Sequence, residues 1–363
     1  MPPPPPAARA PGHLDAAAPG GGPEAQPLDV VGIGNALVDV VAVAGDDVLA
    51  AAGLVKGSME LVDLARAREI YAAMGPAVEV SGGSAANTMA GVAALGGRAG
   101  FVGKVADDDV GAVFTHDIRA IGVEFHPVVA RPDGGNEELV GTGRSLVLVT
   151  GDAERTMATH LGTATTLSAD ELPVDFVARG RVVYLEGYLW DLPAAKKAMR
   201  RAIAECQRHD GAVALSLSDA FCVERHRRDF LELVRDDLDV LFGNEQEVRA
   251  LFGARTLEAA LRAAEETGLL VAVTRGALGC VVVTPRGPVA VPAAPVDHVV
   301  DVTGAGDLFA AGFLYGLTHG SGPEDCARLG ALCASEVITH LGARPQADLR
   351  HLADEAGLLG QAP

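Results

Sequence analysis

The sequence is short of aromatic residues and of positive charge. Phe, Trp and Tyr together make up 4% of the 363 residues. Lys and Arg number 29 against 48 Asp and Glu, which gives a formal net charge of −19 at pH 7. A field of this sign repels phosphate backbones and anionic lipid headgroups, so neither nucleic acid nor a membrane surface is expected as a partner. Solubility is the simplest explanation of this charge.

Paired cysteines and long apolar runs are also missing. The five cysteines are far apart and include no C-x-x-C pair, which argues against a disulfide framework and a zinc site and indicates a cytoplasmic protein. No window has about 20 mostly apolar residues, so no membrane span is expected. The N-terminus also lacks the basic and apolar regions of a secretory signal.

What is present is a long α/β pattern after a biased N-terminal segment. Residues 1–27 are almost wholly Pro, Ala and Gly, a composition that predicts a disordered tail. Residues 28–363 are expected to form one domain, with a doubly wound, mostly parallel sheet flanked by helices. The expected strands are 28–35, 100–105, 182–185, 213–217, 240–242, 270–274 and 280–283. The expected helices are 85–95, 110–121, 193–209, 245–252, 257–267, 305–318 and 324–340.

Three further extended stretches do not fit the alternation of strands and helices. Residues 37–44 follow the first strand at once, which suggests strand pairing rather than a crossover helix. Residues 123–129 and 145–150 lie on either side of the turn-rich segment 132–136. These stretches predict an inserted sheet or an edge sheet.

The strongest chemical motif is Asp301-Val-Thr-Gly-Ala-Gly-Asp307, which runs directly into an apolar helix. The small residues Gly304, Ala305 and Gly306 let backbone N–H groups converge where the helix N-terminus adds partial positive charge, as an anion hole requires. Asp307 lies in the first turn, where its carboxylate can take a proton from a substrate hydroxyl. The same residues could instead form only a glycine-rich helix cap.

A second glycine cluster, Ser81-Gly-Gly-Ser-Ala-Ala-Asn87, begins another helix. Gly83 would allow a ligand close to the backbone, with Asn87 one turn further on, although packing of a small-residue helix on the sheet explains the cluster equally. Asn35 and Asp39 follow the first strand, at the end where open α/β sheets place ligands. The pair Gly32-Ile-Gly34 is not a dinucleotide fingerprint, because the third glycine is absent and a strand follows.

Two shorter segments lie between these clusters. In Asn244-Glu-Gln-Glu247 the spacing is that of a capping box, and the two side chains could also hold the waters of a Mg²⁺ ion. Thr274-Arg-Gly-Ala-Leu-Gly279 joins two strands and could line a nucleotide or be a plain hairpin turn.

Together these motifs resemble the ribokinase-like (PfkB) family of carbohydrate and nucleoside kinases, over about residues 28–346. The two glycine clusters stand in the family's order and separation, and Gly34-Asn-Ala-Leu-Val-Asp39 is most similar to the adenosine-kinase-like branch. The resemblance implies a ribokinase-like fold in which 37–44, 123–129 and 145–150 form a small β-sheet lid.

The resemblance also implies a role for each motif. It makes Asp307 the catalytic base beside the anion hole, with ATP as the phosphate donor and Mg²⁺ as a cofactor. The residues it assigns to the sugar hydroxyls are Asn35, Asp39, Gly83 and Asn87. It assigns Thr274, Gly276 and Gly279 to ATP. It places Asn244 and Glu247 in the Mg²⁺ network, and it puts Asp301 and Thr303 near a site for a monovalent cation such as K⁺.

Other assignments follow from position. Arg144 or Arg155 would approach the phosphates when the lid closes, and Glu186 could reach the acceptor site. Phe101, Phe125 and Trp190 are the candidates for stacking on adenine.

The resulting hypothesis is an ATP-dependent kinase acting on a hydroxymethyl group, with the 5′-hydroxyl of adenosine as leading acceptor. A sugar kinase acting on ribose, fructose or a related sugar keeps the same mechanism. A non-catalytic ligand-binding protein would keep the fold alone. A monomer and a homodimer both remain open.

Overall fold

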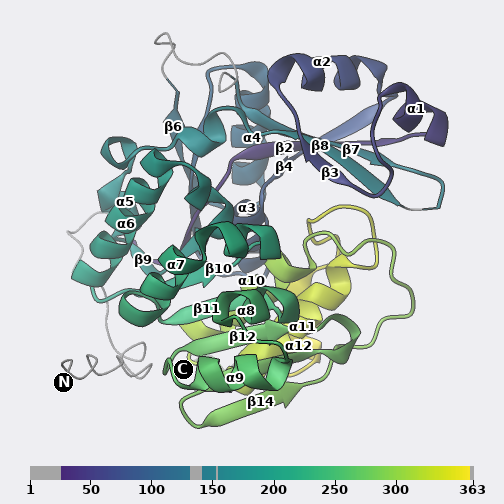
Figure 1. Cartoon of the computed structure of the whole chain (residues 1–363). Coiled ribbons are helices and arrows are strands. Elements are labelled where there is room, and N and C mark those ends of the chain that lie inside the picture. The colour runs from purple at the N-terminus through teal and green to yellow at the C-terminus, as the bar shows by residue number, and fades with distance from the viewer. Residues whose placement is uncertain (1–25, 131–140, 153, 360–363) are drawn as a thin grey trace.

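The computed structural model describes residues 26–130, 141–152 and 154–359. They form a nine-stranded sheet and a separate five-stranded sheet. Figure 1 shows the small sheet, with its own two helices, projecting from one end of the larger α/β body. The predicted tail, 1–27, lies almost wholly outside the described residues.

The large sheet has the strand order β14-β13-β12-β11-β10-β9-β1-β5-β6. From β6 to β12 all neighbours are parallel, and only the last two pairs are antiparallel. The bounds are β1 Leu28–Ile33, β5 Ala99–Val105, β6 Glu124–Val129, β9 Gly180–Glu186, β10 Ala212–Ser216, β11 Val240–Asn244, β12 Leu270–Thr274, β13 Cys280–Thr284 and β14 Gly287–Val291. The predicted doubly wound, mostly parallel sheet is therefore confirmed.

Helices cover both faces of this sheet because its strands are apolar on both sides. Alternate residues of β1 show the division, since Val30 packs in one buried cluster and Val31 in the other. The helices on the Val30 side are α3 Ser84–Ala94, α4 Asp109–Ala120, α10 Ala305–Thr318, α11 Pro323–Val337 and α12 Leu349–Glu355. Those on the Val31 side are α5 Val174–Val177, α6 Pro193–Arg208, α7 Ala220–Asp236, α8 Glu245–Phe252 and α9 Leu257–Glu265. In the described part of the chain, no helix is long and apolar enough to span a bilayer.

The chain order reverses at β1, which has β5 on one side and β9 on the other. Such a switch point leaves a crevice at the carboxyl ends of the strands, where ligands of open α/β sheets bind. Asn35 and Glu186 lie at this edge, at the ends of β1 and β9. The fold thus gathers the predicted polar residues in one place.

The small sheet has the order β3-β8-β7-β2-β4. Its bounds are β2 Leu37–Val43, β3 Met59–Leu61, β4 Ala77–Gly82, β7 Gly143–Val149 and β8 Arg155–His160. Its helices α1 Asp46–Ala51 and α2 Leu64–Ala73 bury one face, where Val38 and Leu146 meet Ile70. The stretches expected at 37–44 and 145–150 lie in this sheet.

The assignment of 123–129 to the small sheet is wrong. Strand β6 pairs in parallel with β5 at the edge of the large sheet. Phe125 holds it there, because its ring lies 5.8 Å from that of Phe101 and 5.2 Å from that of Phe114. The buried position of these rings also removes Phe101 and Phe125 as adenine-stacking residues, and Trp190 is equally buried, against Phe230.

Candidate active site

Helix α10 begins with an unusual turn that exposes backbone N–H groups. Gly304, its N-cap, has φ +79°, a conformation that favours glycine. The N–H of Ala305 bonds to the Val302 carbonyl and that of Leu308 to the Gly304 carbonyl. Gly306 and Asp307 lie between them in the first turn, where N–H groups have no intrahelical acceptor. Of the predicted set Gly304, Ala305 and Gly306, the N–H of Ala305 therefore has a partner, whereas the N–H groups of Gly306 and Asp307 are placed to bind an anion.

The Asp307 carboxylate is held by two side chains of α3. Ser84 Oγ donates to one carboxylate oxygen at 2.6 Å, and Asn87 Nδ2 donates to the other at 3.0 Å. Burial raises the pKa of Asp307 above its usual 3.8, while these two hydrogen bonds and nearby Arg344 oppose the rise. The carboxylate is thus fixed in place and partly desolvated, as a general base requires.

Asn35 and α3 meet at a buried carboxylate, Glu186. Its oxygens accept from Asn35 Nδ2 at 2.6 Å and from the backbone N–H of Ala85 at 3.0 Å. Burial raises the pKa of Glu186 to about 7. Glu186 therefore aligns Asn35 with the start of α3, whereas the sequence suggested that it could reach the acceptor site.

Two side-chain amide oxygens at this junction accept no hydrogen bond from the part of the chain that the structure describes. Asn35 Oδ1 and Asn87 Oδ1 are both buried and have no hydrogen-bond partner among the described residues. A buried acceptor without a donor is costly, so each oxygen is suited to a hydroxyl of a bound ligand. Gly83, with φ +98°, lies beside them, and a Cβ there would be 2.1 Å from the Asn35 carbonyl oxygen.

Asp39 lies on β2 with its carboxylate packed against Gly82. No donor to this carboxylate is found in the part of the chain that the structure describes. Burial raises its pKa to about 6, against the attraction of Arg344 and Arg155. An unpaired carboxylate at this depth is suited to bind two neighbouring hydroxyls of a sugar.

The other two predicted segments lie side by side, because Asn244 of β11 and Thr274 of β12 are in register. Asn244 and Glu247 form the predicted capping box, and burial raises the pKa of Glu247 to about 7. Thr274 leads into the turn at Gly276–Leu278, and Gly279 follows with φ +79°. This edge lies at the carboxyl ends of the strands, on the same side as Asn35.

The donor set around Asn244 and Glu247 fits Mg²⁺ only indirectly. In the described ranges no group of three or more His, Cys, Asp or Glu side chains could hold a metal ion. Mg²⁺ commonly keeps several waters and binds through one or two carboxylates together with substrate phosphates. A single buried carboxylate at this edge is compatible with that mode.

Asp301 is bound by three donors. Its carboxylate accepts from Arg155 Nη1 at 2.6 Å, from the N–H of Thr303 at 3.0 Å and from the N–H of Gly342 at 3.0 Å. Both side chains of the ion pair are at least nine-tenths buried. Since a guanidinium and N–H groups occupy this carboxylate, it does not fit as a ligand of a monovalent cation.

Only one of the two candidate arginines faces the site. Arg155, on β8 of the small sheet, reaches Asp301 directly before the turn into α10. Arg144 is paired with Val38 and lies on the opposite face, with its guanidinium 6.0 Å from the Tyr71 ring. The expectation for Arg144 is wrong, because alternate residues of a strand point to opposite faces.

Comparison with known proteins gives a consistent result. The pfkB family carbohydrate kinase model matches residues 54–349. A Sinorhizobium meliloti structure described as adenosine kinase is 47% identical, covers 91% of this chain and 99% of its own, and superposes with a TM-score of 0.82. A probable sugar kinase from Rhizobium etli is 43% identical, with coverages of 92% and 100% and a TM-score of 0.83.

A curated relative is also described as a sugar kinase. An uncharacterized sugar kinase of Archaeoglobus fulgidus is 30% identical over 255 residues, which are 70% of this chain and 96% of that protein.

Proposed function

We propose that this protein phosphorylates a nucleoside, on the premise that the chain belongs to the pfkB carbohydrate kinase family. It is a phosphotransferase with an alcohol group as acceptor. Within that activity, the acceptor we propose is the 5′-hydroxyl of adenosine. A sugar such as ribose or fructose is the second candidate, favoured by the sugar-kinase relatives.

The observation that carries the nucleoside proposal is the face of the small sheet around Asp39. Cross-strand partners share a face, and Asp39 is opposite Val80, while Val41 is opposite Val78. Arg155 lies on the same face and reaches the large domain, so this face is turned toward the candidate site.

This face is strongly apolar and open. Its exposed members lie on three strands, and their exposed fractions are 76% for Val43, 65% for Val78, 63% for Leu61 and 49% for Met59. A free sugar carries hydroxyls on every side, so it would gain little binding free energy from contact with these apolar side chains. A nucleoside joins a ribose, whose hydroxyls suit Asp39, to a flat base that can cover aliphatic side chains.

The proposed mechanism uses groups already positioned. Asp307 takes the proton of the acceptor hydroxyl while the oxygen of that hydroxyl forms a bond to the γ-phosphorus of ATP. The bond between that phosphorus and the bridging oxygen breaks, and ADP leaves with the electron pair. The N–H groups of Gly306 and Asp307 stabilise the negative charge of the transferring group. Mg²⁺, held through water by Asn244 and Glu247, would neutralise charge on the phosphates.

The small sheet is proposed to act as a lid. Arg155 and Asp301 already join the sheet to the loop before α10. A closed lid excludes water, which would limit ATP hydrolysis without an acceptor.

The test is ADP release by the purified protein with ATP and Mg²⁺, measured with adenosine, other nucleosides, ribose, fructose and no acceptor. Turnover stimulated by adenosine and not by free sugars supports the proposal. Turnover with sugars alone would give the sugar-kinase alternative, and binding without turnover would give a ligand-binding protein.

The apolar face gives a prediction about Met59. Met59→Asp places a carboxylate where the base is proposed to lie, and we expect the KM for adenosine to rise about tenfold, a cost of roughly 1.4 kcal/mol. The KM for ATP should change less than about twofold, because Met59 of β3 and Thr274 of β12 lie in different sheets. Steady-state kinetics with each substrate varied in turn measure both effects.

Val55→Asp is the matched control, because Val55 is also exposed but lies in the connection between α1 and β3. It should leave both KM values unchanged. An equal rise of the adenosine KM in both variants would show a general charge effect and contradict the assignment of this face.

The ion pair of Asp301 gives a prediction about monovalent cations. Since Arg155 supplies the positive charge there, we expect kcat to change less than about twofold when K⁺ is replaced by tetramethylammonium at constant ionic strength. A strong and specific activation by K⁺ would instead restore the role first expected for Asp301 and Thr303.

A further inference from the structure

The segment after α11 lies directly against the turn that begins α10. The N–H of Gly342 donates to Asp301, and the N–H groups of Val300 and Asp301 donate to the Ile338 carbonyl. Ala343 is buried and so close to Gly304 that a Cβ added to that glycine would lie 2.7 Å from the Ala343 Cβ. The segment therefore supports the backbone that precedes the exposed N–H groups.

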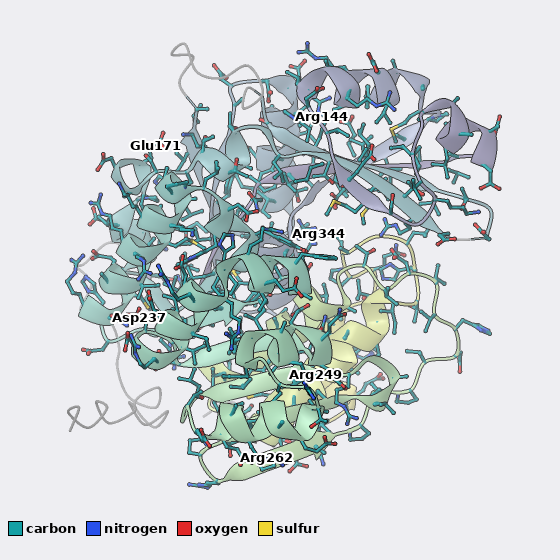
Figure 2. All side chains as sticks on the ribbon, viewed as in Figure 1. Arg144, Glu171, Asp237, Arg249, Arg262 and Arg344 are labelled. Carbon is teal, nitrogen blue, oxygen red and sulfur yellow. The ribbon has the colours of Figure 1, made fainter. Side chains whose placement is uncertain are left out.

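Arg344, the next residue, extends from this segment to α3. Its Nε and Nη2 donate to the Ser81 carbonyl at 3.0 and 2.6 Å, and Nη1 donates to the Ala86 carbonyl at 2.8 Å. Nη2 also donates to Ser81 Oγ at 2.9 Å. Figure 2 shows Arg344 between the small sheet and the helices of the large domain. One guanidinium thus joins the end of β4 to the first turn of α3.

The two side chains that hold the Asp307 carboxylate lie within or directly beside the segment between these two contacts. Ser84 lies inside the bracketed segment 81–86 and Asn87 directly follows it, and both donate to Asp307. A planar guanidinium with several fixed donors holds backbone carbonyls at defined positions, which a flexible ammonium cannot do as well. Arg344 is therefore placed to set the orientation of the Asp307 carboxylate without touching it.

Arg344 also supplies positive charge to an acidic site. Burial lowers its pKa to about 10, while Asp117, Asp39 and Asp307 oppose that change. Asp117 of α4 is itself bonded by the N–H and hydroxyl of Ser81. Asp39 and Asp307 have no ion pair of their own in the described part of the chain.

Several charged or polar groups face Asp307, and Arg344 is the cation among those that shift its pKa. They come from α3, β2, β9 and the segment after α11, and they are Ser84, Asn87, Asp39, Glu186, Tyr184 and Arg344. Asp39 is additionally near Arg155. Loss of Arg344 would leave Asp307 among acidic and neutral groups.

We infer that Arg344 is a positioning residue for phosphoryl transfer: it orients the segment that presents Ser84 and Asn87 to Asp307, and it supplies positive charge near that carboxylate. The inference rests on the proposed role of Asp307 as the base. It assigns a function to a residue that none of the sequence motifs contains.

The test is the dependence of kcat on pH for Arg344→Gln and Arg344→Lys, with the acceptor found for the wild-type protein. Without the nearby positive charge, the pKa of Asp307 rises, so the acidic limb of the profile should move up by about one pH unit in Arg344→Gln. At a pH on that limb, kcat should fall at least about tenfold. Arg344→Lys keeps the charge but loses the planar set of N–H donors. The acidic limb of its pH profile should therefore stay near the wild-type position, while kcat falls at all pH values.

Arg350→Gln is the matched control, since Arg350 of α12 donates to the Leu95 carbonyl at the opposite end of α3. It should keep the wild-type profile. Thermal unfolding of each variant identifies any that fail to fold. If Arg344→Gln is one of them, Arg344→Lys still tests the positioning role, because a wild-type kcat at all pH values in that variant would overturn it.

The outcomes separate the two hypotheses. If the acidic limb of the kcat profile of Arg344→Gln stays at the wild-type pH, with or without a uniform fall of kcat, the inference is overturned and the proposed function is left intact. Absence of turnover by the wild-type protein with every acceptor overturns the proposed function itself.

Discussion

Asp307→Asn is expected to lower kcat by about 10³-fold, because an amide of the same shape cannot take the proton of the acceptor hydroxyl. Ser84 can still donate to the retained oxygen of the side chain, so the first turn of α10 should keep its position. The KM for ATP should stay within about twofold of the wild-type value. ADP release at saturating ATP and acceptor measures the loss.

Asp29→Asn makes the same chemical change at the start of β1, where Asp29 accepts from the backbone N–H of Arg98. This control should keep the wild-type kcat, because Asp29 is remote from the carboxyl ends of the strands. If Asp307→Asn keeps more than about a tenth of the wild-type kcat, Asp307 is not the base.

The pH profile of the wild-type enzyme should agree with the same assignment. A general base is active when deprotonated, so kcat falls as pH drops through the pKa of Asp307. Because burial raises that pKa above 3.8, the acidic limb should lie above the range of an exposed aspartate. The position of the limb is read from kcat measured in buffers of constant ionic strength.

Local patterns predicted the main sheet well. The apolar runs that became β1, β9 and β11 are continuous because both of their faces are buried, so each could be recognised from its own residues. The 123–129 error arose because a short edge strand looks the same in either sheet. Only the contact of Phe125 with Phe101 and Phe114, which is not local in sequence, decides between them.

The site was predicted where one motif held the whole feature. The turn into α10 is such a case, since its glycines and Asp307 are consecutive. Ser84 lies within the glycine cluster at 81–87, yet its contact with Asp307 joins residues 223 positions apart. Arg344 and the Arg155–Asp301 pair carry no local signal at all, because their partners come from distant elements.

The two glycines at the start of α10 give the last prediction, since they are separated by one residue but have different surroundings. Gly304 has φ +79°, and a Cβ there would lie 2.7 Å from the Ala343 Cβ and 2.8 Å from its Cα. Gly304→Ala should therefore combine backbone strain with a collision, at a cost of about 3 kcal/mol in the free energy of unfolding. The turn must also move, so kcat should fall by about 10²-fold through misplaced N–H donors.

Gly306 has helical backbone, and a Cβ there would meet nothing within 4 Å. Gly306→Ala should keep or slightly raise the free energy of unfolding, since alanine favours the helix by about 0.5–1 kcal/mol. Its methyl group would nevertheless occupy space proposed for the transferring phosphoryl group, so kcat should fall at least about tenfold. Urea unfolding together with kcat separates the two variants. Because Gly306→Ala is expected to stay as stable as the wild-type protein, its kcat reports on the site alone. A wild-type kcat in this variant would therefore show that the phosphoryl group does not approach this turn.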